Sequence, residues 1–169
     1  MKTILIEKLP RIIKNKSRLE KSLKIKITNR GKEVSFDGKA EDEFVAEQVF
    51  DALNFGFPYS TAMLIKDEEF MFEILNIKSY VKRKDSEHLK RTKARIIGTK
   101  GKTLATLSSL TNCFFELKEN EVGIIGDSMY IKNAQDAIIS LIKGTKTSNV
   151  YAYLEKHQPL KFDNLDLKR

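Results

Sequence analysis

The stretch that decides the fold is Ile96-Ile97-Gly98-Thr99-Lys100-Gly101-Lys102-Thr103, in which two glycines enclose a pair of polar residues. Glycine at both ends permits a tight reversal with positive φ and lets another backbone approach closely. A helix that follows the second glycine would offer unpaired N–H groups to phosphate oxygens, and two lysines add positive charge. The flanking Ile96, Ile97 and Leu104 could form a floor on which bases lie. The stretch is therefore predicted to bind a phosphate backbone.

Two other interpretations of this loop are open. Gly101-Lys102-Thr103 matches the end of the nucleotide-binding P-loop, G-x-x-x-x-G-K-[ST]. The first glycine of that motif would be residue 96, which is Ile, and a basic helical segment stands where a P-loop has a buried strand. The glycines could also form only a structural turn. We favour phosphate-backbone binding over both.

The residues around the loop are strongly basic. Residues 78–102 contain ten Lys and Arg against Asp85 and Glu87, in a chain whose 31 basic and 23 acidic residues leave a net charge of +8. Such a concentration favours a polyanionic partner through attraction and counterion release. A solvated helical face that only keeps the protein soluble is the alternative for a bare charge run.

An internal repeat with an offset of 88 residues organises the chain. Its matches are Gly38 with Gly126, Ala46 with Ala134, Leu53 with Leu141, Gly56 with Gly144, and apolar Phe50 with Ile138. Each copy predicts the order strand, helix, loop, helix, strand, strand, helix. The sequence therefore indicates an α+β fold of two modules, each a three-stranded sheet covered by three helices on one face.

The expected elements follow from periodicity and turn residues. In the first copy they are a strand at 3–7, helical segments within 11–22, a hairpin of 24–28 and 33–37, and a helix at 41–54. That helix should bury Phe44 or Val45, Val49 or Phe50, and Leu53. In the second copy they are a strand at 71–80, helices at 86–97 and 102–111, strands at 113–117 and 122–125, and a helix at 130–143.

These elements divide the chain into four parts: a first module at 1–57, a connecting segment at 58–70, a second module at 71–157 that ends in a helix near 149–157, and a polar tail at 158–169. The first module has Lys14-Asn15-Lys16-Ser17 at the junction between its helices. That junction lacks glycine, so close backbone approach is not expected there. The apolar residues of the connecting region predict that the modules pack as one unit; they are Phe57, Tyr59, Met63, Leu64, Phe70 and Phe72.

Composition argues against several classes of function. The chain has one cysteine, Cys113, and two histidines, so neither an internal disulfide nor a recognisable metal cluster is expected. No apolar run reaches the length of a membrane span, and the N-terminus lacks the apolar core of a signal peptide. No triad, carboxylate pair or phosphate-hydrolysing motif is visible. We expect a cytoplasmic protein that is not an enzyme and has no cofactor.

G-x-x-G between two helices of such a module is the signature of the KH domain, whose loop clamps about four nucleotides. The run from Arg95 to Thr103 and the later Ile131-Lys132-Asn133-Ala134 resemble the KH-repeat ribosome-assembly proteins of archaea and eukaryotes. The resemblance implies two tandem type I KH modules, of which the first has a degenerate loop. The chain lacks the long N-terminal extension of the eukaryotic forms, so it looks more like an archaeal member.

The resemblance also implies a function and partners. The chain would bind single-stranded RNA, namely small-subunit rRNA near its 3′ end, as a small-ribosomal-subunit assembly factor. Its protein partners would be the endonuclease that matures this rRNA end and, in the alternative role of a translation-linked adaptor, the α subunit of initiation factor two. The residues predicted to bind RNA are Arg91, Lys93, Arg95, Ile97, Gly98, Thr99, Lys100, Gly101, Lys102 and Thr103.

Overall fold

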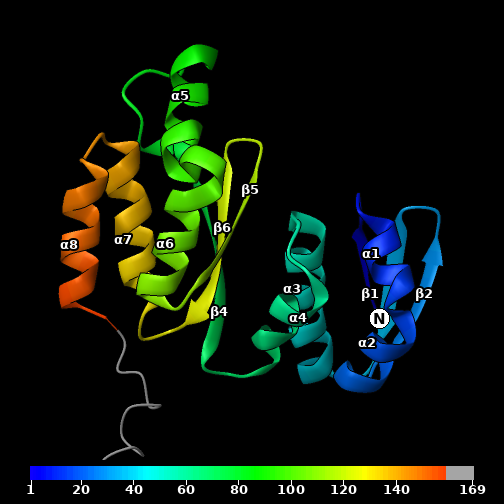
Figure 1. Ribbon diagram of the computed structural model, residues 1–169. Helices are drawn as coiled ribbons and strands as arrows, with labels where there is room; N and C mark the ends of the chain where they lie inside the picture. Colours follow the sequence, from blue (N-terminus) through cyan, green and yellow to red (C-terminus); the bar gives the residue numbers. More distant parts are fainter. Residues whose placement is uncertain (159–169) are drawn as a thin grey trace, which may run out of the picture.

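Two three-stranded antiparallel sheets, each with its own set of helices, organise the chain (Figure 1). The structure is a computed structural model, and it describes residues 1–158. The predicted polar tail therefore lies, from residue 159 onward, outside the described residues. The α+β class and the order of elements agree with the prediction.

The first module has the elements β1 (Lys2–Leu5), α1 (Leu9–Lys14), α2 (Lys16–Leu23), β2 (Lys26–Arg30), β3 (Glu33–Asp37) and α3 (Ala40–Phe55). Its strands pair in the order β1-β3-β2. Ile12 of α1, Leu19 of α2 and Phe50 of α3 are fully buried in one apolar cluster with the strand residues Val34 and Phe36. One side of the sheet is thus covered by the three helices.

The second module has the elements β4 (Phe70–Asn76), η2 (Ile77–Ser79), α5 (Ser86–Ile97), η3 (Thr99–Gly101), α6 (Lys102–Thr111), β5 (Phe114–Lys118), β6 (Glu121–Asp127), α7 (Ile131–Ile142) and α8 (Thr147–Lys156). Its strands pair in the order β4-β6-β5. The predicted strand at 71–80 stops at Asn76, whose side chain accepts a hydrogen bond of 2.9 Å from the N–H of Lys78. That bond begins a 3₁₀ turn in place of further strand.

The internal repeat is visible in side-chain packing. A Cβ placed on Gly126 would lie 2.3 Å from Sγ of Cys113, and one placed on Gly38 would lie 3.0 Å from Cγ2 of Ile25. Ile25 and Cys113 are themselves separated by the repeat offset of 88 residues. Each module therefore places a glycine over the residue that precedes its second strand, because a larger residue would not fit.

The connecting segment is folded and packed. It forms α4 (Tyr59–Ala62) and the 3₁₀ turn η1 (Met63–Lys66), and Figure 1 shows α3 and α4 between the first module's sheet and the second module's sheet. The rings of Phe55, Phe57 and Phe72 lie 5.7 to 6.0 Å apart. A Cβ on Gly123 of β6 would lie 2.7 Å from the ring of Phe55. The face of the second sheet that its own helices leave open is thus covered by the first module.

Helix α3 buries Val49, Phe50 and Leu53, as its periodicity predicts. Phe44 is 58% exposed, however, and of the predicted pair only Val45, which is half-buried, packs against the core. Within residues 1–158, no helix combines the length and the hydropathy that a membrane crossing requires.

Candidate nucleic-acid interface

The Gly98–Gly101 loop joins α5 to α6 through a backbone that few residues can adopt. Gly98, Lys100 and Gly101 have φ values of 75°, 55° and 74°, so three of its four residues lie in the region that favours glycine. Gly98 also has ψ of 173°, a combination that is open essentially to glycine alone. The N–H of Gly101 donates to the carbonyl of Gly98 over 3.2 Å and closes the turn.

The two glycines are needed for different reasons. A Cβ on Gly98 would lie 2.1 Å from Oγ1 and 2.7 Å from the backbone nitrogen of Thr103, so the loop is folded against the start of α6. A Cβ on Gly101 would meet nothing within 4 Å. Close packing fixes Gly98, whereas only the sign of φ requires glycine at position 101. Thr103, predicted to bind RNA, is buried beneath the loop and supports its shape.

The loop leads into a helix start that no side chain caps. Gly101 is the N-cap of α6 and has no side chain to accept the first N–H groups of that helix. Thr99, Lys100 and Lys102 are exposed around this helix start. The N–H of Lys102 donates to the carbonyl of Thr99, so the helix start offers its later N–H groups, its partial positive charge and two ammonium groups. Phosphate oxygens bind to arrangements of this kind in proteins.

The basic residues of α5 are not equivalent. Arg91 is exposed and Lys93 is half-buried, and both leave their charges available at the surface. Arg95 instead donates from Nη2 to the carbonyl of Ile142, at 3.4 Å, at the C-terminal end of α7. A cation at that position stabilises a helix terminus. The structure therefore gives Arg95 a contact within the fold, in addition to the RNA contact that the sequence predicts.

The predicted apolar floor is only partly present. Ile96 is fully buried in the second module's core, so its side chain cannot contact a base, and this part of the prediction is wrong. Ile97 is 38% exposed and Leu104 is half-buried, so both remain beside the loop. The two adjacent isoleucines of a helix point about 100° apart, which places only one of them at the surface.

A cleft of about 270 Å³ continues from α6 toward β5, and the sequence did not predict it. The exposed Phe114 of β5 and Ala105 of α6 are among its lining residues, together with Phe57 at the end of the first module and Pro58 and Thr61 of the connecting segment. The adjacent Phe114 and Phe115 in a strand must point to opposite sides, so one of them had to leave the core. The adjacent pair of phenylalanines could therefore have indicated that one ring is exposed. The wall of the cleft formed by Phe57, Pro58 and Thr61 depends on a long-range contact, which the sequence does not reveal.

The corresponding junction of the first module has an ordinary backbone. Asn15 lies between α1 and α2 with φ of −108°, and its side chain donates back to the carbonyl of Arg11 over 2.9 Å. None of the residues 14–17 has positive φ. The glycine-type turn that presents donors in the second module is therefore replaced here by a closed helical junction, as the missing glycines predict.

Residues 1–158 contain no group of three or more His, Cys, Asp or Glu side chains arranged to hold a metal ion. Burial raises the pKa of the Cys113 thiol to about 11, which makes it a poor nucleophile at neutral pH.

Comparison with known proteins places this geometry in a family. Residues 71–159 match the model of the second KH domain of PNO1, a eukaryotic-type (type I) KH domain. Among curated proteins, a KH domain-containing protein of Methanocaldococcus jannaschii is 27% identical over 85% of this chain and 65% of its own length. The pre-rRNA-processing protein pno1 of Schizosaccharomyces pombe is 32% identical over 61% of this chain.

A solved structure resembles nearly all of the described chain. The a/eIF2alpha–aDim2p–rRNA complex from Pyrococcus horikoshii contains a chain with a TM-score of 0.80 and 27% identity, covering 92% of both chains. This chain spans less than two thirds of the curated relatives named above, with 42% of the fission yeast protein. The family is not an enzyme family, in agreement with the sequence-based expectation. The G-x-x-G turn, the order of elements and the match over residues 71–159 show that this chain belongs to the type I KH-domain family, in the group represented by the second KH domain of PNO1.

Proposed function

We propose that this protein binds single-stranded RNA through the Gly98–Gly101 loop and serves as an assembly factor near the 3′ end of small-subunit rRNA. The observation that carries the proposal is the loop itself. Gly98 is packed against Thr103 with a backbone available only to glycine, and the turn leads directly into the N-terminus of α6, which no side chain caps. A KH domain uses this arrangement to clamp a nucleic-acid backbone.

Two further observations support the choice of RNA partner. The basic residues of α5 and of the segment before it lie next to the loop in sequence, and they supply a field that attracts a polyanion. Relatives of this chain are named for pre-rRNA processing, and a solved relative is an rRNA complex. An rRNA segment is therefore the ligand to test first.

The test is a charge reversal that leaves both glycines in place. Thr99→Asp with Lys100→Asp puts two carboxylates where phosphate must approach and changes the local charge by about −3. The probe is a short single-stranded RNA with the sequence of the 3′ end of small-subunit rRNA, titrated by fluorescence anisotropy over a salt series. We expect a large loss of affinity, and a salt slope that falls by about one for each phosphate group that the variant no longer binds.

The first module offers a matched control. Lys16→Asp with Ser17→Asp makes the same change in charge at the corresponding junction, where the backbone has no positive φ. This control should bind RNA with an affinity close to that of the unaltered chain. If both double variants lose affinity equally, or if neither does, the glycine loop is not the RNA site.

A second proposed role is that of a translation-linked adaptor, which is supported by the Pyrococcus horikoshii complex because that complex also contains a/eIF2alpha. We propose an initiation-factor α subunit as a protein partner, and the endonuclease that matures the rRNA 3′ end as another. Co-purification of each candidate with the full chain, before and after nuclease treatment, separates protein contacts from shared RNA. An adaptor would retain the α subunit after nuclease treatment and would show no rRNA crosslinks.

A further inference from the structure

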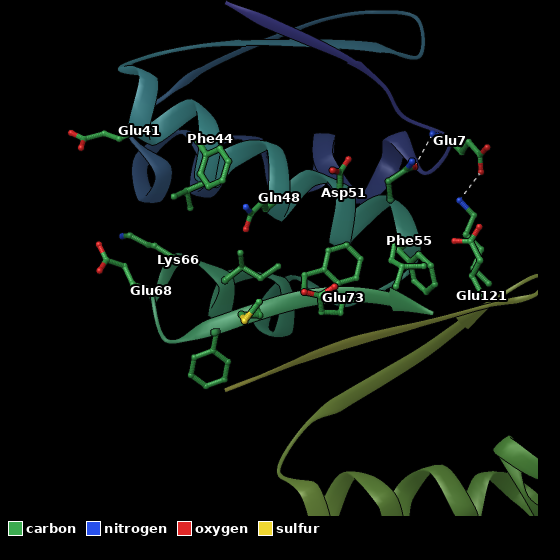
Figure 2. A pocket seen from close by; sticks show the side chains of 18 of the residues that line it. Glu7, Glu41, Phe44, Gln48, Asp51, Phe55, Lys66, Glu68, Glu73 and Glu121 are labelled. Carbon is green, nitrogen blue, oxygen red and sulfur yellow. Dashed lines mark hydrogen bonds and ion pairs between the residues drawn. The ribbon is translucent and has the colours of Figure 1, made fainter. Parts of the chain in front are cut away.

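A groove of about 1060 Å³ lies between α3 of the first module and β4 of the second. Figure 2 shows Phe44, Gln48 and Asp51 of α3 on one side of it and Glu73 of β4 on the other. We call it the inter-module groove. It shares no residue with the Gly98–Gly101 loop or with the cleft between α6 and β5.

One wall of the groove is the edge of a sheet. Strand β4 is at the edge, because the strand order is β4-β6-β5. Five consecutive residues, Phe70 to Ile74, line the groove. Successive side chains of a strand point to opposite faces, so a groove lined by all five runs along the edge of the strand.

Backbone groups on this edge are available for pairing. The bonds from Ser128 N–H to Glu69 O and from Ile77 N–H to Asn120 O, both 2.8 Å, show that the odd-numbered residues face β6. Because facing alternates along a strand, Phe72 and Ile74 direct their N–H and C=O groups outward. An exposed edge with free donors and acceptors is a template for an added strand.

Apolar side chains stand exposed beside this edge. Ile74 is 47% exposed, Met71 is 40% exposed, and Phe44 is the exposed residue of α3 noted above. All three line the groove. Together they offer an apolar surface of the kind that a bound peptide covers.

The charge of the groove is opposite to that of the whole protein. Seven carboxylates line it against Lys66 and Lys118, in a chain with a net charge of +8. Lys118 is already engaged, because its Nζ lies 3.2 Å from Oε2 of Glu7. Burial and the neighbouring Glu47 raise the pKa of Asp51 above its ordinary value, so this carboxylate lies where a cation would stabilise it. A phosphate backbone would be repelled here.

We propose that the inter-module groove binds an extended, basic segment of a protein partner, which adds a strand to the free edge of β4. Alternate side chains of that segment cover Phe44 and Ile74, and the others place Lys or Arg beside Asp51 and Glu73. About five residues of extended chain, roughly 16 Å, match the length of β4 that lines the groove. RNA and this partner therefore bind separate surfaces of opposite charge.

The test uses the full chain and a synthetic eight-residue peptide of alternating lysine and valine, followed by fluorescence anisotropy. The groove variant is Asp51→Lys with Glu73→Lys. Lysine at position 51 suits the last turns of α3, where a cation is favoured, so the variant should fold. We expect its affinity for the peptide to fall by at least tenfold, roughly the effect of placing like charges together.

Three controls make the result specific. Asp136→Lys with Glu155→Lys makes the same change in charge on α7 and α8, away from the groove, and should leave peptide affinity unchanged. A peptide of alternating glutamate and valine should not bind. A lysine–valine peptide methylated on every backbone nitrogen cannot donate to the strand edge, and it should bind at least tenfold more weakly than the parent.

The proposal is overturned if the two charge variants bind the peptide equally, if the methylated peptide binds like its parent, or if the unaltered chain binds no peptide. It is also overturned if sedimentation shows a dimer that the groove variant dissociates, because a second copy of the chain would then be the occupant. RNA affinity, measured on the same two variants, should be equal. Failure of peptide binding with intact RNA binding leaves the proposed function untouched.

Discussion

Replacing Gly98 with alanine should cost far more RNA affinity than the same change at Gly101, although both glycines belong to one motif. Gly98 has φ of 75° and ψ of 173°, a region essentially closed to other residues. Its added Cβ would also lie 2.7 Å from the backbone nitrogen of Thr103, which cannot move without shifting the start of α6. The altered loop must therefore adopt another shape in the free protein.

The affinity falls by the free energy needed to restore the binding shape. Occupying a region reserved for glycine costs about 1–3 kcal/mol, and the contact with Thr103 places Gly98→Ala at the upper part of that range, or roughly 30- to 150-fold in affinity. Gly101→Ala meets no atom within 4 Å. It bears only the cost of positive φ, about 1 kcal/mol or roughly fivefold.

The assay is RNA titration of both variants by fluorescence anisotropy, with circular dichroism to verify the fold. Thr103→Ala in the Gly98→Ala background should not restore binding, because the clash with the backbone nitrogen persists. Equal losses for the two alanine variants would refute this reasoning, and so would full binding by Gly98→Ala.

Three other predictions concern the second module. Gly126→Ala should destabilise the fold by about 1–3 kcal/mol through overpacking against Cys113, and chemical denaturation should show partial recovery when Cys113→Ala is added. The N–H groups of α5 hold the pKa of Asp85 below its ordinary value, so the ionised carboxylate stabilises the fold. Asp85→Ala should therefore lower the thermal midpoint at neutral pH, and its difference from the unaltered chain should disappear as pH falls below about 4. Thermal unfolding at several pH values can test this. Arg95→Ala should lower the thermal midpoint because of its contact with the end of α7, whereas Arg91→Ala should weaken RNA binding without that effect. A midpoint shift of equal size in both arginine variants would contradict the distinction.

Local signals in the sequence were enough to predict the loop and the helices beside it. Helices at 86–97 and 102–111 have the predicted bounds. Asp85 caps the first of them with a hydrogen bond of 3.2 Å from the N–H of His88, and Gly98 ends it. Capping and positive φ are properties of a few neighbouring residues, so they can be read from a single sequence.

Features that depend on packing between distant segments could not be predicted in the same way. The contact of Arg95 with Ile142 joins residues far apart in the chain. The burial of Ile96 beside an exposed Ile97 depends on the rotation of α5 against its neighbours. To predict the inter-module groove, one must know that the first module covers the open face of the second sheet. The sequence of either repeat alone does not contain that information.

Because Cys113 is packed beneath Gly126, the reactivity of its thiol reports how often the second module opens. Cys113 is the sole thiol of the chain, and its side chain is sealed within the core of that module. Burial raises the pKa of this thiol to about 11, so it is almost entirely protonated at neutral pH even before access is considered. A thiol reagent can therefore react only when the strands and helices around Cys113 separate, so its reaction rate counts those openings in the unmodified protein. RNA bound at the loop between α5 and α6 should lower the rate at which the reagent modifies Cys113. A peptide bound at β4 should lower that rate independently.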